Sequence, residues 1–263
     1  LHISHAGIYA FSNRVMVGES ENIQLMDPIS AIEVIEANRD IIVGIKVRLG
    51  KRTSGRNGFL PYEFALDVAE KTGLPIMVHI DEAPPSYSEV ISKMRTGDIL
   101  THCFRPSPNG PIGIDGHILP AVLKARERGV IFDIGHGMGS LSFQVARKML
   151  KNGFNPDTIS SDIHALCIDG PVYDQLTTLS KFLNLGMPIF ELIRSTTENC
   201  ANAMLRPELG KLKIGTVGDV SILNIISGKF QYSDVLGDAF YGDRKIESAG
   251  LILNGAWLDS VSK

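Results

Sequence analysis

Residues 74–104 read LPIMVHIDEAPPSYSEVISKMRTGDILTHCF and contain two apolar runs of strand length, each ending in a histidine. The first run ends at His79, and the second, after a segment with helical spacing, ends at His102. An apolar run without alternation is typical of a strand buried on both faces, as in a parallel sheet. Because α/β enzymes place polar side chains at the carboxyl ends of such strands, both histidines are candidate site residues.

The same βα pattern, a unit of roughly 30 residues, continues on both sides of this segment. Strands are predicted over residues 1–4, 41–47, 74–80, 98–104, 130–134 and 158–163. Helices that end directly before a glycine, which tolerates the left-handed conformation of a helix end, are predicted over residues 61–72, 87–96, 117–128, 141–152 and 171–185. Two further helices are predicted, over 28–37 with Asp27 as N-cap and Pro28 as first residue, and over 188–205.

This order of elements predicts an α/β fold of the TIM type. A closed (β/α)8 barrel has eight strands. The sequence supplies six, so we expect a barrel that lacks its first two βα units, over residues 1–205. An open doubly wound sheet is the alternative, but its ligands bind at a switch point rather than at successive strand ends. In residues 206–263 apolar and polar residues alternate, and glycines interrupt the pattern. Short strands are expected at 239–241 and 246–253. This region is therefore predicted to be part of a small β-sandwich domain.

The composition narrows the class of protein. Hydrophobic residues make up 44% of the 263 residues and charged residues 21%, with a net charge of −3. This balance favours a small-molecule substrate over a nucleic-acid or membrane-surface partner. The sequence contains no apolar run of about 18 residues, so no membrane span is predicted. Three cysteines without CxxC spacing favour a reducing compartment, and we expect a cytoplasmic protein that forms a homo-oligomer.

Four ligand-type residues occur at equivalent positions, the carboxyl ends of four predicted strands: Lys46, His79, His102 and Asp162. Neutral imidazoles suit zinc, and a lysine that reacts with carbon dioxide becomes an anionic carbamate that could bridge two metals. Asp162 could bind a metal and accept a proton from water. Singly, each residue also fits a structural role, as a hydrogen-bonded histidine, a solvated lysine or a helix N-cap. Their joint occurrence favours a site for one or two Zn²⁺ ions.

Four further residues are candidates for substrate binding. Arg48 follows Lys46 on the same strand and could pair with a substrate carboxylate, or form a surface ion pair. His136 and Gly137 lie in a glycine-rich turn before a helix, where the backbone can approach a ligand. His164 could orient Asp162 or contact the substrate, and a packing role is equally open.

The motifs that contain these residues resemble the amidohydrolase superfamily, more closely its dihydroorotase-like amidohydrolase/deacetylase subgroup. They are GIKVR at 44–48, VHIDEAP at 78–84, THCF at 101–104, DIGHGMGS at 133–140 and SDIH at 161–164. The resemblance extends over essentially the whole chain. It implies that Lys46 is a carboxylated lysine bridging two metals, that His79 and His102 ligate one metal, and that Asp162 is the catalytic aspartate.

One departure from the family pattern concerns the His-x-His pair that the family has at the end of its first barrel strand. His2 and His5 do not have this spacing. We therefore expect the chain to be N-terminally incomplete, without that pair and without the first part of the sandwich.

The expected function is metal-dependent hydrolysis of an amide or ester bond in a small molecule. Metal-activated water would attack the carbonyl, and Asp162 would transfer the proton to the leaving group. A deaminase of the same superfamily and a non-catalytic scaffold or inactive fragment remain as alternatives. The retained Lys, His, His and Asp argue against the scaffold.

Overall fold

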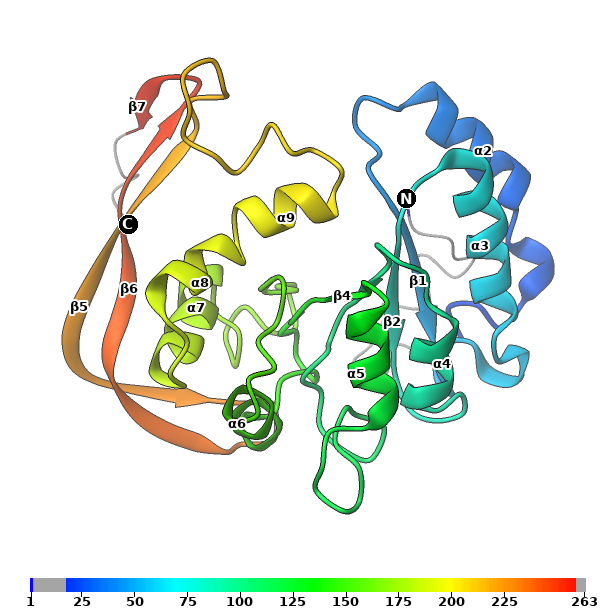
Figure 1. Ribbon diagram of the computed structural model, residues 1–263, viewed down its shortest axis with the longest axis horizontal. Helices are drawn as coiled ribbons and strands as arrows, with labels where there is room; N and C mark the ends of the chain where they lie inside the picture. The colour runs from blue at the N-terminus through cyan, green and yellow to red at the C-terminus, as the bar shows by residue number, and fades with distance from the viewer. Residues whose placement is uncertain (2–17, 259–263) are drawn as a thin grey trace. The chain divides into compact units, whose positions relative to one another are not determined.

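The computed structural model describes Leu1 and residues 18–258. The chain divides into two compact units, Leu1–Asp133 and Ile134–Lys263, and each unit is described by itself (Figure 1). The predicted first strand over 1–4, with His2, and the neighbouring His5 lie outside the described residues. The predicted domain boundary between residues 205 and 206 stays a prediction.

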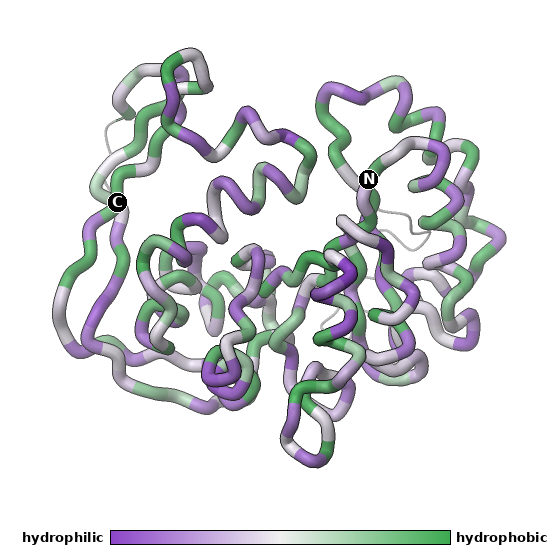
Figure 2. The backbone as a smooth tube through the Cα atoms, in the orientation of Figure 1, coloured by the Kyte–Doolittle hydropathy of each residue, from purple (hydrophilic) through white to green (hydrophobic). Residues whose placement is uncertain are grey.

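The first unit is built on a parallel sheet whose strands follow one another in chain order, β1-β2-β3-β4. The strands are β1 (Ile45–Leu49), β2 (Ile76–Ile80), β3 (Ile99–Leu100) and β4 (Ile131–Phe132). Most of their apolar side chains are buried, as in β1, where Ile45, Val47 and Leu49 are at most 1% exposed. Figure 2 shows the hydropathy of these residues along the backbone. The predicted α/β fold with a parallel sheet is therefore confirmed.

Helices of the first unit begin and end where local sequence signals require it. They are α2 (Pro28–Ala37), α3 (Leu60–Thr72), α4 (Tyr87–Lys93) and α5 (Pro120–Glu127), with short 3-10 helices η1 (Ile23–Leu25) and η2 (Gly55–Asn57). Asp27 caps α2 by accepting from the backbone of Ile29 and Ser30, and Gly73 ends α3 with φ of 70°. α3 packs on both β1 and α2. These two helices confirm the predictions over 28–37 and 61–72 to within a residue.

Two predicted helices of this unit are shorter than expected. The helix predicted over 87–96 ends at Lys93, because Met94 is extended and the Asp98 carboxylate accepts from the backbone and guanidinium of Arg95. The helix predicted over 117–128 begins only at Pro120, since residues 112–118 close a loop through an isolated bridge between Ile112 and Ile118. β1 also starts four residues later than predicted, after turns in residues 38–41.

The second unit combines short helices with a long antiparallel ribbon. The helices are α6 (Phe143–Lys151), α7 (Gln175–Asn184), α8 (Ile189–Arg194) and α9 (Glu198–Ala203). The strands are β5 (Val220–Ser233), β6 (Ala239–Leu253) and β7 (Ala256–Leu258), in the order β5-β6-β7. α7 packs on β6, where the Ser180 hydroxyl accepts from the backbone N–H of Ile246 at 2.9 Å. The strands predicted at 239–241 and 246–253 thus form one continuous strand.

Three predictions for the second unit are wrong in their extent. Residues 158–163 do not form a strand, because the adjacent N–H groups of His136 and Gly137 donate to Ser160 and Ser161, which breaks the alternation of a ladder. The helix predicted over 171–185 begins at Gln175. The helix predicted over 188–205 is divided in two, because side chains at 195–197 compete for the carbonyls of the preceding turn.

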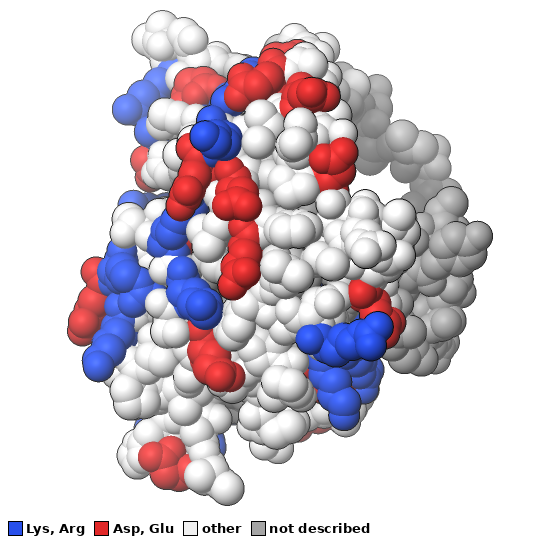
Figure 3. Space-filling model, turned by 90° about the vertical axis from the view of Figure 1, so that its right-hand side faces the viewer, with Lys and Arg blue, Asp and Glu red and all other residues white. Residues whose placement is uncertain are grey.

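No helix among residues 18–258 has the length and apolar character needed to cross a membrane. The face of the molecule in Figure 3 has Lys and Arg side chains interspersed with Asp and Glu.

Candidate metal-binding and catalytic site

His79 and His102 lie next to each other although they are far apart in the chain. His79 is the fourth residue of β2, and His102 follows β3 by two residues. Their ring centroids are 4.6 Å apart and the ring planes meet at 86°. Parallel pairing of β2 with β3 produces this contact, because it aligns Val78 with Leu100 and so brings the two strand ends together. The predicted convergence of these two imidazoles is present in the structure.

The His79 side chain has the state expected of a metal ligand. Burial lowers its pKa well below the usual value, and the charges of His102 and then Arg48 and Lys46 lower this pKa further, so the imidazole is neutral. Its Nδ1 atom is buried and has no hydrogen-bond partner in the structure. A buried polar atom without a partner costs stability, and a neutral ring nitrogen is a preferred ligand for divalent transition metals. The His79 imidazole therefore fits the role of one ligand to a metal ion.

Lys46 and Arg48 lie on β1. The prediction that Lys46 lies at the carboxyl end of its strand is wrong, because β1 continues to Leu49 and Lys46 is its second residue. The register pairs Lys46 with Met77 and Arg48 with His79. The Arg48 Nε atom lies 3.4 Å from the Glu19 carboxylate, which is fully buried. Glu19 was not predicted as a site residue, since nothing in its surroundings in the sequence marks it as a partner of the predicted substrate-binding arginine.

The loop that follows β1 is held by Asp81, the residue directly after β2. The Asp81 carboxylate accepts from the backbone N–H and hydroxyl of Thr53 at 3.0 and 2.8 Å, and from the backbone N–H of Arg52. Burial raises the pKa of Asp81, and these hydrogen bonds oppose the rise. Gly50 is required here, because a Cβ atom at this position would lie 1.8 Å from Asp81 Oδ1. Asp81 was not predicted as a site residue, although its position directly after a strand is typical of one.

Arg105 and Asn109 connect the ends of β2 and β3. The Arg105 guanidinium donates to the carbonyls of Ile80 and Asp81. The Asn109 amide donates to the carbonyl of Asp81 at 2.8 Å and accepts from the N–H of Tyr87 at 2.7 Å. This network fixes the strand ends that bear His79 and His102, which is the preorganisation that a binding site needs.

In the second unit Asp162 and Gly137 lie against each other. Asp162 is exposed and has φ of 46°, and Gly137 has φ of 51°. The Gly137 N–H donates to the carbonyl of Ser161 at 2.9 Å, and a Cβ atom on Gly137 would lie 2.6 Å from Asp162 Oδ2. The glycine-rich turn thus approaches the predicted catalytic carboxylate as closely as only a glycine permits.

His136 is fully buried, and both of its ring nitrogens have partners. Nδ1 lies 2.9 Å from the carbonyl oxygen of Gly137, and Nε2 lies 2.7 Å from the ammonium of Lys181. Burial and the charge of Lys181 lower the pKa of His136 to about 4. Lys181 was not predicted as a site residue, because a lysine within a helix gives no signal of burial.

His164 is half-buried and belongs to the turn that follows Asp162. The His164 Nδ1 atom accepts from the backbone N–H of Leu166 at 3.2 Å. The backbone N–H of His164 donates to the Cys167 sulfur.

The eight predicted site residues thus fall into two groups, one in each unit. Lys46, Arg48, His79 and His102 belong to the first, and His136, Gly137, Asp162 and His164 belong to the second. Within the described part of the chain, no group of three or more His, Cys, Asp and Glu side chains is arranged to hold a metal ion. A third protein ligand for the two histidines must therefore be of another type, as Lys46 is, or come from elsewhere.

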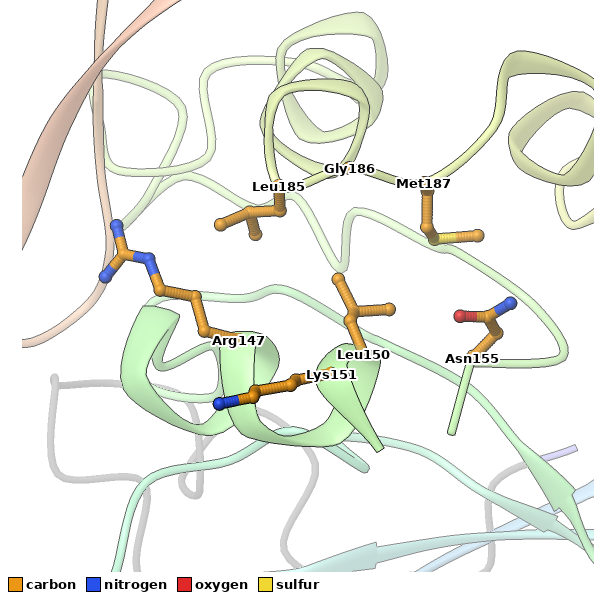
Figure 4. A pocket seen from close by; sticks show the side chains of 7 residues that line it. All are labelled: Arg147, Leu150, Lys151, Asn155, Leu185, Gly186 and Met187. Carbon is orange, nitrogen blue, oxygen red and sulfur yellow. The ribbon is translucent and has the colours of Figure 1, made fainter. Parts of the chain in front are cut away.

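Two cavities of the second unit contain none of these residues. One, of about 260 Å³, lies between the end of α6 and the turn after α7 and is lined by Arg147, Leu150, Lys151, Asn155, Leu185, Gly186 and Met187 (Figure 4). The other, of about 660 Å³, is lined by residues from α7, α8, the 208–219 segment and β5.

No family model matches the chain, but individual known proteins do. The chain is 32% identical over 247 residues to a deacetylase of Brucella anthropi, covering 94% of this chain and 61% of the relative. It is 34% identical over 231 residues to a deacetylase of Enterococcus faecalis, covering 87% of this chain and 63% of the relative. The chain spans about three fifths of the length of these curated relatives.

Solved structures of two other proteins are also similar to this chain. An adenine deaminase superimposes with a TM-score of 0.88 at 32% identity, covering 91% of this chain and 66% of that one. A dihydroorotase superimposes with a TM-score of 0.85 at 29% identity, covering 93% of this chain and 67% of that one. The parallel sheet with histidines at its strand ends defines an α/β protein. The chain belongs to the amidohydrolase superfamily.

Proposed function

We propose that the complete protein is a metal-dependent hydrolase that cleaves a carbon–nitrogen bond of a small molecule, as a deacetylase or dihydroorotase does. The observation that supports this most is the contact of the neutral His79 ring with His102 at neighbouring strand ends, with a buried His79 ring nitrogen that has no protein partner. The relatives named deacetylase and the dihydroorotase neighbour support the same reaction class. Hydrolysis of an ester would use the same groups.

The metal-binding residues in this proposal are His79, His102, Lys46 as its carbamate, and Asp162. Lys46 is half-buried, and its charge acts on His79, so loss of its proton to form a carbamate would remove a cation that opposes metal binding. When bound, one or two Zn²⁺ ions would polarise the substrate carbonyl and lower the pKa of water.

The remaining residues act on the substrate and on the proton. Asp162 would accept the proton from the attacking water and deliver it to the leaving nitrogen. Gly137 would keep the Asp162 carboxylate in position, and Arg48 would pair with a substrate carboxylate while Glu19 holds the guanidinium. His136 and His164 support the turns on which Gly137 and Asp162 lie.

A deaminase of the same superfamily is the second candidate. The adenine deaminase structure superimposes at least as well as the dihydroorotase and is more similar in sequence. Deamination also cleaves a carbon–nitrogen bond with an activated water, so the same residues would serve both reactions. A non-catalytic scaffold is disfavoured, because all four ligand-type residues are retained.

The proposal extends to fold and assembly. The sheet would form part of a (β/α)8 barrel without its first two βα units, over 1–205, and the ribbon of 206–263 part of a β-sandwich. The complete protein would be a cytoplasmic homo-oligomer that binds a small molecule rather than nucleic acid or membrane.

The test is metal analysis and a substrate panel with the complete protein. We expect roughly one to two equivalents of zinc per chain, and hydrolysis of N-acetyl amino acids or dihydroorotate that chelators remove and zinc restores. Faster release of ammonia from adenine than hydrolysis of either amide would instead select the deaminase. Protein that binds no divalent metal and converts no member of the panel would refute both.

Alanine at Gly137 is expected to lower kcat by about 100-fold with little change in KM. The added Cβ atom would lie 2.6 Å from Asp162 Oδ2 and would have to displace the carboxylate, and a displacement of about 1 Å typically costs such a factor. Gly139→Ala is the matched control, since a Cβ atom added at Gly139 would meet no other atom within 4 Å, and it should retain full activity. Equal rates for both variants would contradict the role of Gly137.

A further inference from the structure

Lys181 is a cation in the interior of the second unit. It lies on α7 and is 1% exposed. Its ammonium lies 2.7 Å from His136 Nε2 and 2.6 Å from the carbonyl oxygen of Pro171. Burial of a charged group is unfavourable even when the group is hydrogen-bonded, and an apolar side chain of similar volume is often as stable. A lysine at this position therefore calls for a reason other than stability.

The partners of His136 determine which ring nitrogen has the proton. A carbonyl oxygen only accepts, so Nδ1 must have the hydrogen that it donates to Gly137. Nε2 then has a lone pair and accepts from the Lys181 ammonium. Because an ammonium has no lone pair, it excludes the tautomer with hydrogen on Nε2. The contact thus selects one form of the imidazole.

The contacts continue from His136 to the predicted catalytic carboxylate. The Gly137 carbonyl accepts from His136, its N–H donates to Ser161, and its Cα lies against Asp162. Lys181 is therefore connected to Asp162 by an unbroken series of contacts within one unit.

Other charged and aromatic groups near Lys181 do not replace this contact. The carboxylates of Asp234 and Asp174 act on the ammonium through space, and both serve other donors: Asp234 accepts from the N–H of Phe143, and Asp174 caps α7. The ring of Phe143 lies 6.0 Å from the ammonium. The direct acceptors are His136 and the carbonyl of Pro171.

We propose that Lys181 is a positioning residue for Asp162: its ammonium fixes His136 in the form that holds the Gly137 carbonyl, and this keeps the glycine turn against the carboxylate. The role rests on the proposed hydrolytic function. It assigns to α7 a part in the reaction that the sequence motifs do not indicate.

The first test compares Lys181→Met with Ser180→Ala in the complete protein. Methionine removes the charge and retains an unbranched chain, so kcat should fall at least tenfold while KM and zinc content stay within twofold and the melting temperature does not drop. Ser180 is the control, because it is equally buried on the same helix and bonds to Ile246 instead. Ser180→Ala should lower the melting temperature and leave kcat unchanged.

A double variant tests the route through His136. In His136→Asn the side-chain amide can donate to Gly137 as Nδ1 does, without needing Lys181. Lys181→Met should therefore reduce kcat less than twofold further in the His136→Asn background. A tenfold reduction in both backgrounds would overturn the proposal, since Lys181 would then act by another route.

The ring nitrogens report on the same contact without substrate. In protein with ¹⁵N-labelled histidine, the signal assigned to His136 by its loss in His136→Asn should show hydrogen on Nδ1. In Lys181→Met it should become a mixture of tautomers and titrate at higher pH, because a nearby positive charge is removed. An unchanged tautomer would overturn the inference whatever the activity. If this shift occurs in protein that hydrolyses no substrate, the proposed function has failed and the His136 contact stands.

Discussion

Asparagine in place of His79 is expected to remove bound metal from the complete protein and to lower kcat/KM by more than about 100-fold. Losing even an outer partner of a metal ligand typically costs about 10- to 100-fold, and His79 would be a direct ligand. Its neutral ring and its buried, unsatisfied Nδ1 atom are what a metal would use. Asparagine remains polar but has no ring nitrogen. Zinc per chain and the rate with the best substrate of the panel measure the effect.

The control is His117→Asn, which replaces an exposed histidine before α5 and should change neither zinc content nor rate. His102→Asn should behave as His79→Asn does, because the two rings are in contact. Retention of both metal and rate by either of these two variants would remove the basis for the metal site.

Asparagine in place of Asp162 is expected to lower kcat by about 10²- to 10⁴-fold, the range typical of a general acid–base group. The amide is nearly the same size as the carboxylate, so it should still fit beside Gly137, but it cannot accept the proton from water. Zinc content should fall less than in His79→Asn, since His79, His102 and Lys46 would still bind. Measurement of kcat and zinc together therefore distinguishes the two roles of Asp162.

Asp169→Asn provides the comparison, because Asp169 is an exposed carboxylate in the same segment. This variant should have the rate of the unmodified protein. An Asp162→Asn protein with an undiminished kcat would exclude Asp162 as the proton acceptor and would leave the proposed mechanism without a base.

Some features of the fold were predictable from the sequence because they depend on neighbouring residues alone. The N-cap at Asp27 and the left-handed stop at Gly73 are satisfied within a few residues of chain, and both are present in the structure. Burial on both faces likewise identified the parallel strands ending near His79 and His102. The strand-end positions of His79 and His102 followed from this pattern, whereas those predicted for Lys46 and Asp162 did not hold.

Other features depend on contacts that local sequence does not encode. The helix predicted over 188–205 is divided because hydroxyls at 195–197 bond back to preceding carbonyls. The strand predicted over 158–163 fails because two successive N–H groups donate to it from the glycine turn. Asp81 and Asn109 were overlooked because their partners lie in distant parts of the chain.

By itself the sequence determined that this is an α/β protein with imidazoles at neighbouring strand ends, since apolar pattern and strand direction decide where such residues emerge. Only the tertiary structure decided which side chains touch: the edge-on contact of His79 with His102, and the burial of Lys181 against His136. The physical reason is that burial and hydrogen bonding of a side chain depend on distant segments packed around it. A lysine in a helix is expected to be exposed, and only the tertiary structure shows that Lys181 is buried.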